Sequence, residues 1–474
     1  MIVLPADRLE WVEGWGESLG AAGYVWRPST VAQVRVVLAE AERAKIPLVP
    51  RGAGCSYGDA AFRAESVVLD VGRMNRVLAW DPEAGEIDVE PGVTLRQLWR
   101  YVLGDGWWPP VVTGTMETTV GGCLAMNVHG KNNWARGTFG EHCVELDLMT
   151  VDGAVRTVSR DGDRELFNAV VGSFGLLGVI TRARLKMKRV SSGMVEVKAV
   201  SAPNLETMLR LTDEAKDQWE YVVGWIDAFA KGRHLGRGLL HFARHLEPGE
   251  DPAPARSLQV GDQDLSEEIF GILPRSVMWR LIKPLCNKID MSWVNRLKYL
   301  SGATVGEGAV YRQTFAEFSF LLDYVPNWKR IYRPGGLIQH QTFVPEAEAE
   351  GVFGKQLELC RRQGQPSFLG VLKRHRPDES LMGHGIDGFS LALDFPVVSR
   401  RRARLWDLVR LLAEPVVEAG GKFYPAKDCA LPGELYRATF HDGQIQRLLE
   451  FKTKMDSQAM LRSALADRLL GTWS

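Results

Sequence analysis

The first 190 residues alternate between helical and strand-like hydrophobic patterns. After Thr30, which is typical of a helix N-cap, apolar residues recur at helical spacing as far as Ala41, and the apolar run 46–50 then predicts a strand. Thr94 precedes a second amphipathic helix. Further strands are predicted at 87–90, 143–151, 154–158 and 178–187, around a helix at 165–171. The mixture predicts an α+β unit that ends near residue 190.

A second pattern begins near Val195. Strands are predicted at 221–225, 238–242 and 390–394, and helices at 346–362 and 399–418. The intervening stretch 247–264 is rich in Pro, Gly and Asp, which predicts an exposed, mobile loop. After Gly420-Gly421 the chain is expected to return to the first unit, with final helices at 443–454 and 457–470. The predicted parts are therefore 1–190, 191–421 and 422–474.

Composition narrows the function classes. The 474 residues hold 58 Lys plus Arg and 58 Asp plus Glu, so no net positive field attracts nucleic acid, which is excluded as a partner. The six cysteines form no C-x-x-C pair and the nine histidines no H-E-x-x-H motif, so no metal site is predicted. We find neither a signal-peptide pattern nor an apolar run near the length of a membrane span, about 18 residues. A cytoplasmic protein is expected.

Two glycine-rich stretches are the strongest candidates for a ligand site. In the first, at 50–59, Gly52, Gly54 and Gly58 can adopt positive φ angles that turn successive N–H groups inward, as in an anion-binding nest. Their spacing is not that of a Rossmann turn, and the chain has no P-loop motif. The second, at 112–132, is rich in glycine and hydroxyl residues and lets backbone approach a flat ligand. One loop for a diphosphate and one for a ring system suit a dinucleotide such as FAD.

Together the two stretches resemble the flavin loops of the vanillyl-alcohol oxidase/p-cresol methylhydroxylase (PCMH-type) family of FAD enzymes, most of all a branch that oxidises a lipid-linked pentose. The similarity continues in order through 137–140, 171–178, 224–228, 327–330, 337–341, 368–373, 393–396 and 424–428. The resemblance implies an α+β fold: a two-part PCMH-type FAD-binding domain at 1–190, an α+β substrate (cap) domain with an antiparallel sheet at 191–421, and a C-terminal segment at 422–474 that returns to the FAD domain.

The resemblance also implies which residues contact FAD. They are Arg51, Gly52, Ala53, Gly54, Cys55, Ser56, Tyr57, Gly58, Gly114, Thr115, Thr119, Gly121, Gly122, Ala125, Val128, His129, Gly175, Gly178, Val179, Tyr424 and Ala426. Many relatives carry a histidine at the position of Cys55 and bond it covalently to the flavin. Noncovalent FAD is expected here, and a covalent link through Cys55 is the alternative.

Flavin-dependent oxidation of an alcohol needs a group that takes the hydroxyl proton. His129 and Lys427 match positions suited to this step, and the sequence does not choose between them. The residues expected to bind substrate are Lys131, Lys373, Gln339, Gln341, Trp225 and Tyr57. The chain departs from the pentose-oxidising branch at Ala392, Ser319 and Ser390, where a cysteine, a tyrosine and an asparagine are expected. The reaction type therefore carries over better than the substrate does.

The function implied is oxidation of a secondary alcohol, in a sugar or a polyprenyl-phosphate-linked sugar, by hydride transfer to FAD. Two alternatives stay open: a flavin-dependent reductase of a carbon–carbon double bond, and a flavin- or lipid-binding protein without turnover that serves a downstream reductase. The basic, tryptophan-bearing stretch 272–300 is typical of an amphipathic segment at a membrane surface, but equally of a helix packed on the core, and Pro284 argues against one unbroken helix.

Overall fold

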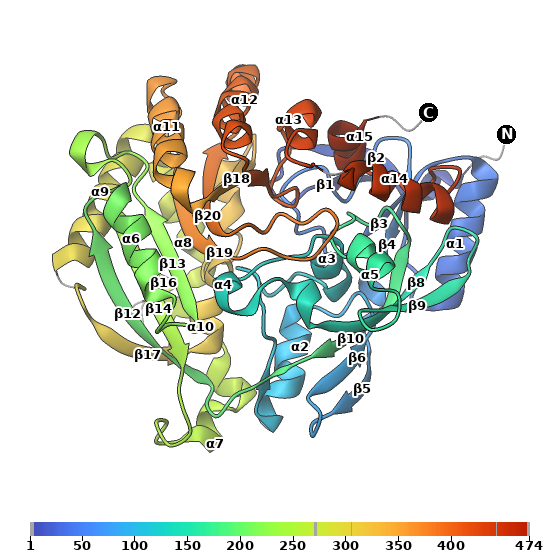
Figure 1. Cartoon of the computed structure of the whole chain (residues 1–474), viewed down its shortest axis with the longest axis horizontal. Coiled ribbons are helices and arrows are strands. Elements are labelled where there is room, and N and C mark those ends of the chain that lie inside the picture. Colours follow the sequence, from blue (N-terminus) through green and yellow to red (C-terminus); the bar gives the residue numbers. More distant parts are fainter. Residues whose placement is uncertain (1–3, 270–272, 305, 442, 472–474) are drawn as a thin grey trace.

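The computed structural model describes residues 4–269, 273–304, 306–441 and 443–471. Figure 1 shows two halves side by side, with helices α11 and α12 above one half and the C-terminal helices above the other. The boundary of 272–300 at residue 272 lies outside the described residues. Among these residues, no helix has the length and apolar character that a membrane crossing requires.

The N-terminal half holds two sheets. The four-stranded sheet has the order β1-β2-β4-β3 and consists of β1 (Leu9–Glu13), β2 (Gly20–Trp26), β4 (Val67–Asp70) and β3 (Leu48–Arg51). The five-stranded sheet has the order β5-β6-β10-β8-β9 and consists of β5 (Val77–Asp81), β6 (Glu86–Val89), β10 (Val179–Lys186), β8 (Cys143–Met149) and β9 (Val155–Ser159). Only the first sheet contains parallel pairs, because β4 runs parallel to both β2 and β3.

Local sequence signals account for the helices of this half. Helix α1 (Val31–Ala44) begins after Thr30, whose side chain accepts the backbone N–H of Gln33. Helix α2 (Leu95–Val102) begins after Thr94 with a reciprocal capping box to Gln97. Both helices bury their apolar face in the core, as their hydrophobic spacing predicts. Shorter helices follow at α3 (Val120–Ala125), α4 (Asn133–Arg136) and α5 (Arg164–Val170).

The second half is built on one eight-stranded sheet in which every neighbouring pair is antiparallel, as the family resemblance implies. Its order is β17 (Val310–Thr314), β12 (Met194–Ala202), β14 (Gly238–His245), β13 (Tyr221–Ile226), β19 (Leu369–His375), β20 (Gly388–Pro396), β18 (Leu337–Pro345) and β21 (Lys422–Phe423). Because β21 pairs with β18, this sheet extends two residues past the expected boundary at 421.

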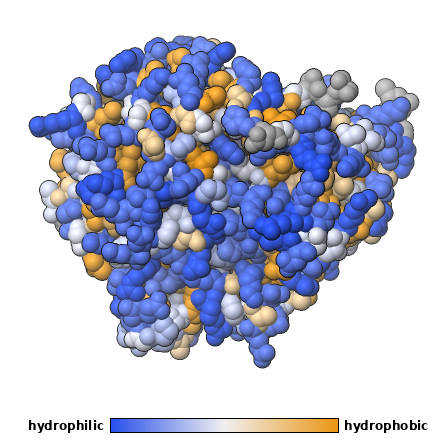
Figure 2. Space-filling view, viewed as in Figure 1, coloured by the Kyte–Doolittle hydropathy of each residue, from blue (hydrophilic) through white to orange (hydrophobic). Residues whose placement is uncertain are grey.

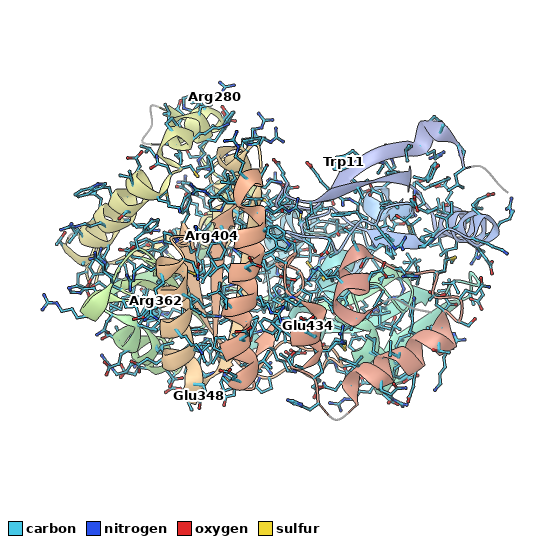
Figure 3. All side chains as sticks on the ribbon, turned by 90° about the horizontal axis from the view of Figure 1, so that it is seen from above. Trp11, Arg280, Glu348, Arg362, Arg404 and Glu434 are labelled. Carbon is cyan, nitrogen blue, oxygen red and sulfur yellow. The ribbon has the colours of Figure 1, made fainter. Side chains whose placement is uncertain are left out.

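Helices cover one face of the eight-stranded sheet. They are α6 (Leu205–Ala215), α11 (Ala349–Arg362) and α12 (Arg402–Glu418). Figure 3, seen from above, shows α11 and α12 in front of this sheet. The opposite face turns toward the N-terminal half, and its far end is covered by α9 (Lys288–Thr304), where Gly302 packs against Leu239 of β14. This opposite face is called the site face below.

Two expectations are only partly right. Most residues of the stretch 247–264 are exposed, as expected, but the stretch also contains the short helix α7 (Pro254–Ser257) and the buried side chain of Gln263, which donates to the carbonyl oxygens of Gly193 and Ser257. The last helix, α15, covers only Ala464–Leu470 rather than 457–470, and α14 (Gln444–Met455) precedes it. Residue spacing does not show that Gln263 is buried and hydrogen-bonded. It also does not show that the residues before Ala464 are not helical.

Candidate active site

A cavity of about 1130 Å³ runs between the two glycine-rich stretches and the returning segment at 424–427. Its lining reaches from both glycine-rich stretches to the returning segment, so the cavity suits an extended ligand such as a dinucleotide. All the residues expected to contact FAD line it except Gly58 and His129. Further apolar wall residues, which the sequence did not single out, are Trp15, Val71, Pro91, Phe174, Ile180 and Leu322.

The glycines let the two stretches pack tightly around this cavity. A Cβ atom on Gly52 would lie 2.1 Å from Thr119 Oγ1, and Gly54 has a φ of 68° that L side chains rarely adopt. The hydroxyl of Thr119 is buried and has no hydrogen-bond partner within the described residues. A buried polar group without a partner is unusual in a folded protein. The cavity therefore offers an unpaired hydroxyl and closely approached backbone, which fits FAD.

Gly58 has a different role from the other loop glycines. It lies against the returning segment, where a Cβ atom would be 2.2 Å from the carbonyl oxygen of Asp428 and 2.5 Å from Cys429 Cβ. The adjacent Tyr57 N–H donates to the carbonyl oxygen of Ala426 at 2.9 Å. Gly58 thus joins the first glycine stretch to the segment that carries Lys427, instead of lining the cavity.

The site face of the eight-stranded sheet is polar although it is buried. On β20, Leu391, Leu393 and Phe395 point to the helices, while Ser390, Ala392 and Asp394 alternate with them and point to the site. The register of the sheet aligns a row across four strands. That row is Trp225, Val371, Ala392 and Gln341. Ala392, which departs from the pentose-oxidising branch, therefore stands at the centre of the wall.

Three lysines expected at the site come close to one another. Burial lowers the pKa of Lys131 to about 7, and burial together with the positive charges of Lys427 and Lys131 lowers the pKa of Lys373 to about 7. Lys131 donates to the carbonyl oxygens of Phe318 and Ser319, and its own carbonyl accepts the N–H of Val222 on β13. The departure at Ser319 therefore sits directly beside a site lysine.

Lys427 lines the flavin cavity and faces Tyr57. Its Nζ lies 4.6 Å from the centre of the Tyr57 ring, a cation–π distance. Burial lowers the pKa of Lys427 to about 8, while the negative charge of Asp394 acts in the opposite direction. Burial also raises the pKa of Asp394 to about 6. One carboxylate oxygen of Asp394 accepts from Gln339 Nε2, and the other has no hydrogen-bond partner in the described part of the chain.

His129 stands at the centre of a buried aromatic group rather than in the cavity wall. Its ring centre lies 4.9 Å from that of His375, 5.4 Å from that of His384 and 4.9 Å from that of Tyr424. Burial, followed by the positive charges of Lys373 and the neighbouring histidines, holds the pKa of His129 well below its usual range. Gln341 Nε2 lies 3.2 Å from His129 Nε2, which leaves the proton on Nδ1, an atom without a partner among the described residues.

Two neighbours complete the polar wall. Ser390 Oγ lies 3.1 Å from Gln341 Nε2 and 2.7 Å from His375 Nε2, so the serine at this departure position links the two side chains. His375 Nδ1 in turn lies 3.0 Å from Asn133 Oδ1. Trp225 is buried, with Lys298 Nζ 4.3 Å from its ring centre. The structure thus brings together all the expected substrate residues around one polar face next to the cavity.

The sequence reading missed Asp394, His375, His384 and Asp323. Asp394 had a usable signal, since a lone acid within the apolar strand 391–395 is costly to bury without a function. Asp323 had no such signal in the sequence. Its carboxylate accepts hydrogen bonds from Thr115 Oγ1 and from the N–H of Met116, both at 2.7 Å, and so joins two parts of the chain that lie far apart in sequence. Only the fold reveals this contact.

Cys55 lines the cavity as expected. Burial raises the pKa of its thiol to about 12, with the nearby Cys123 adding to the effect. The thiol therefore stays protonated at neutral pH, and the thiol form is a poor nucleophile.

Fold and cavity together define a flavin-dependent oxidoreductase, and comparisons with known proteins agree. Residues 22–159 match the FAD binding domain family model. Over 462 residues, covering 96% of both chains, the chain is 31% identical to decaprenylphosphoryl-beta-D-ribose oxidase of Mycolicibacterium smegmatis. It is also 28% identical over 39% of its length to a probable mitochondrial D-lactate dehydrogenase of Danio rerio, and 29% identical over 37% to L-gulonolactone oxidase of Mus musculus; each match covers 39% of the relative. The chain belongs to the vanillyl-alcohol oxidase/p-cresol methylhydroxylase (PCMH-type) family of FAD-dependent oxidoreductases.

Proposed function

We propose that this enzyme oxidises a secondary hydroxyl of a polyprenyl-phosphate-linked sugar by hydride transfer to FAD. The observation that carries the proposal is the meeting of the flavin cavity with a buried polar sheet face that bears Lys373 and Gln341. Amide groups suit sugar hydroxyls, and lysines of lowered pKa suit a phosphate, whose charge favours their protonated form. The relative named as a decaprenylphosphoryl-beta-D-ribose oxidase supports the substrate class.

When bound, FAD supplies the hydride acceptor of the reaction. The residues that would hold it are those of the two glycine stretches, with Thr119 Oγ1 as an unpaired partner. We assign the hydroxyl proton to Lys427, because this lysine lines the cavity and its pKa of about 8 leaves a neutral amine available near neutral pH. His129 is neutral and its Nε2 lies 3.2 Å from Gln341 Nε2, so in this proposal it orients the Gln341 amide on the site face.

FAD is bound noncovalently in this proposal. The thiol of Cys55 is the side chain considered for a covalent link, and its pKa of about 12 keeps it protonated. Denaturation should therefore release the yellow colour from the chain. Ala392, Ser319 and Ser390 leave the lysines and glycine stretches in place but change the substrate wall, so they are the residues expected to set which sugar is accepted.

The proposal is tested by the visible spectrum of the purified enzyme under anaerobic conditions, before and after addition of polyprenyl-phosphoribose. Bleaching of the oxidised flavin bands by this substrate is the expected result, since hydride transfer without oxygen leaves the flavin reduced. A set of other polyprenyl-phosphate sugars gives the preference. Bleaching by NADPH with no response to any alcohol would identify a reductase instead, and a flavin that no compound bleaches would identify a binding protein without turnover.

The pH dependence of flavin reduction should report Lys427. The proton acceptor must be neutral, so the rate at saturating substrate is expected to rise with pH and level off above about 8. The negative charge of Asp394 raises the pKa of Lys427, so Asp394→Asn should move this inflection to lower pH. Stopped-flow spectroscopy from roughly two pH units below to two above the expected inflection measures both effects. A rate that is flat above pH 6 would assign the proton to His129, whose pKa lies well below 6.5.

A further inference from the structure

The helices that cover the far end of the site face expose a row of apolar side chains on their outer side. Helix α8 (Arg275–Ile282), the 3-10 turn η7 (Lys283–Leu285) and α9 form the segment interrupted at Pro284. Leu281, Leu285, Ile289, Trp293 and Leu297 follow one another at intervals of four residues, and Ile289 is 73% exposed and Trp293 58%. Within α9 this spacing places Ile289, Trp293 and Leu297 along one side of the helix, and Leu281 and Leu285 are exposed on α8 and η7 just before it. We call this row, the apolar stripe, together with its flanking basic residues the docking surface.

Within the part of the chain that the structure describes, the basic residues on the docking surface have no carboxylate partner. Among the described residues, none of Arg280, Lys283, Lys288 and Arg296 forms an ion pair with a carboxylate, whereas arginines elsewhere do, as Arg182 does with Asp88, Glu145 and Asp147. The single acid of the described part of α8, η7 and α9 is Asp290, which accepts from Asn287. Figure 3 shows Arg280 at the outer edge of the molecule. Positive charge is thus concentrated here in a chain whose net charge is zero.

A second basic group extends the docking surface. Lys288 and Arg401 line a small pocket of about 410 Å³ with Phe368, Phe395 and Leu405, and Val398 on its rim is 51% exposed. Among the described residues, neither Arg401 nor Arg404 forms an ion pair with a carboxylate, and Arg404 donates to the carbonyl oxygen of Gln363. Their positive charges add to burial in lowering the pKa of Lys288. Exposed apolar side chains and bases without a carboxylate partner therefore occur together on two neighbouring segments.

We propose that the docking surface binds an anionic lipid bilayer, with the apolar stripe in the interface and the bases at the headgroups. Leucine, isoleucine and tryptophan beside unpaired lysine and arginine are the combination that binds such an interface, and each base near an anionic surface contributes about 1 kcal/mol. A protein partner or a second copy would need acidic side chains opposite these bases. On the face shown in Figure 2, hydrophobic residues lie among hydrophilic ones.

The inner side of the same helices forms part of the wall around the site. Cys286 and Met291 pack against the cluster that contains Tyr57, and Lys298 lies over Trp225. Arg275 of α8 lies 3.8 Å from the ring centre of Tyr324, two residues after Leu322 in the cavity wall. If the proposed function holds, a bilayer on the docking surface lies against the side of the enzyme where a lipid-linked substrate is anchored. This consequence rests on the proposed function, whereas bilayer binding itself does not.

Flotation of the FAD-loaded enzyme with vesicles tests the proposal. Vesicles of phosphatidylcholine with about 30% phosphatidylglycerol should carry the enzyme upward, and pure phosphatidylcholine vesicles should not, because the charge term needs anionic lipid. Lys283→Gln and Arg296→Gln should each weaken binding about fivefold, and Ile289→Asp with Trp293→Ala should abolish it. The matched controls are Arg43→Glu and Val36→Asp on α1, two exposed positions that should leave binding unchanged.

Flavin content and flavin reduction by a detergent-dispersed short-chain substrate are measured on every variant. If reduction stays intact while vesicle binding fails in the wild-type enzyme, the docking proposal is overturned and the proposed function is not. Binding that is equal on both vesicle types would also overturn it, since the unpaired bases would then play no part. A wild-type dimer in light scattering that Trp293→Ala converts to a monomer would assign the surface to a second copy of the chain.

Discussion

Replacing Lys427 by methionine should slow flavin reduction by about 10²–10⁴-fold, the usual contribution of a positioned acid or base. Methionine keeps most of the side-chain volume over the Tyr57 ring but cannot take a proton. The residual rate should lose the pH dependence that levels off near 8. Anaerobic stopped-flow reduction at saturating substrate measures the loss, and the flavin spectrum of the resting variant shows whether FAD is still bound.

Two further variants separate the roles of charge and proton transfer. Lys427→Arg keeps a positive charge that does not deprotonate, so it should be about as slow as the methionine variant if Lys427 takes the proton. Recovery of most of the rate in the arginine variant would show that only charge matters there. Lys355→Met, at an exposed position on α11, is the control for loss of a lysine and should reduce flavin at the wild-type rate.

Gly58→Ala is expected to lower the free energy of unfolding by about 1–3 kcal/mol and to weaken FAD binding at least tenfold. The new methyl group would meet the backbone of Asp428 at 2.2 Å, and a backbone carbonyl cannot rotate away as a side chain can. The first glycine stretch must then separate from the segment that carries Lys427. Chemical denaturation of the apoprotein and fluorescence titration with FAD give the two quantities.

Gly351→Ala on α11 is the matched control, because a Cβ atom there meets nothing within 4 Å. Its stability should equal or exceed that of the wild type, since alanine favours a helix over glycine. Wild-type FAD affinity in Gly58→Ala would contradict the bridging role of Gly58, even if the variant were less stable.

The glycine stretches could be identified from sequence because their function depends on local backbone. Gly52 and Gly54 serve by lacking a side chain, and this property is visible in the sequence itself. Helix starts at Thr30 and Thr94 are equally local, since each cap bonds to a residue three positions later. The antiparallel sheet of the second half was predicted from the ordered family motifs and not from local signals.

The polar site face could not be derived in the same way. Trp225, Ala392 and Gln341 become neighbours only through strand register, and a shift of one residue would turn each of them to the helix side. His384 joins His129 from a loop far along the chain. Gly58 and His129 belong to the two glycine-rich stretches, but neither lines the cavity. Gly58 packs against the returning segment, and His129 lies behind the cavity wall.

Lys373 lies within reach of the positive charges of Lys131 and Lys427, in a region where burial already disfavours the ammonium form of all three lysines. Near neutral pH these side chains therefore divide between the ammonium form and the neutral amine. If the proposed substrate binds here, its phosphate would favour the ammonium form of the lysines that it contacts, so substrate binding and proton uptake by the enzyme would be linked.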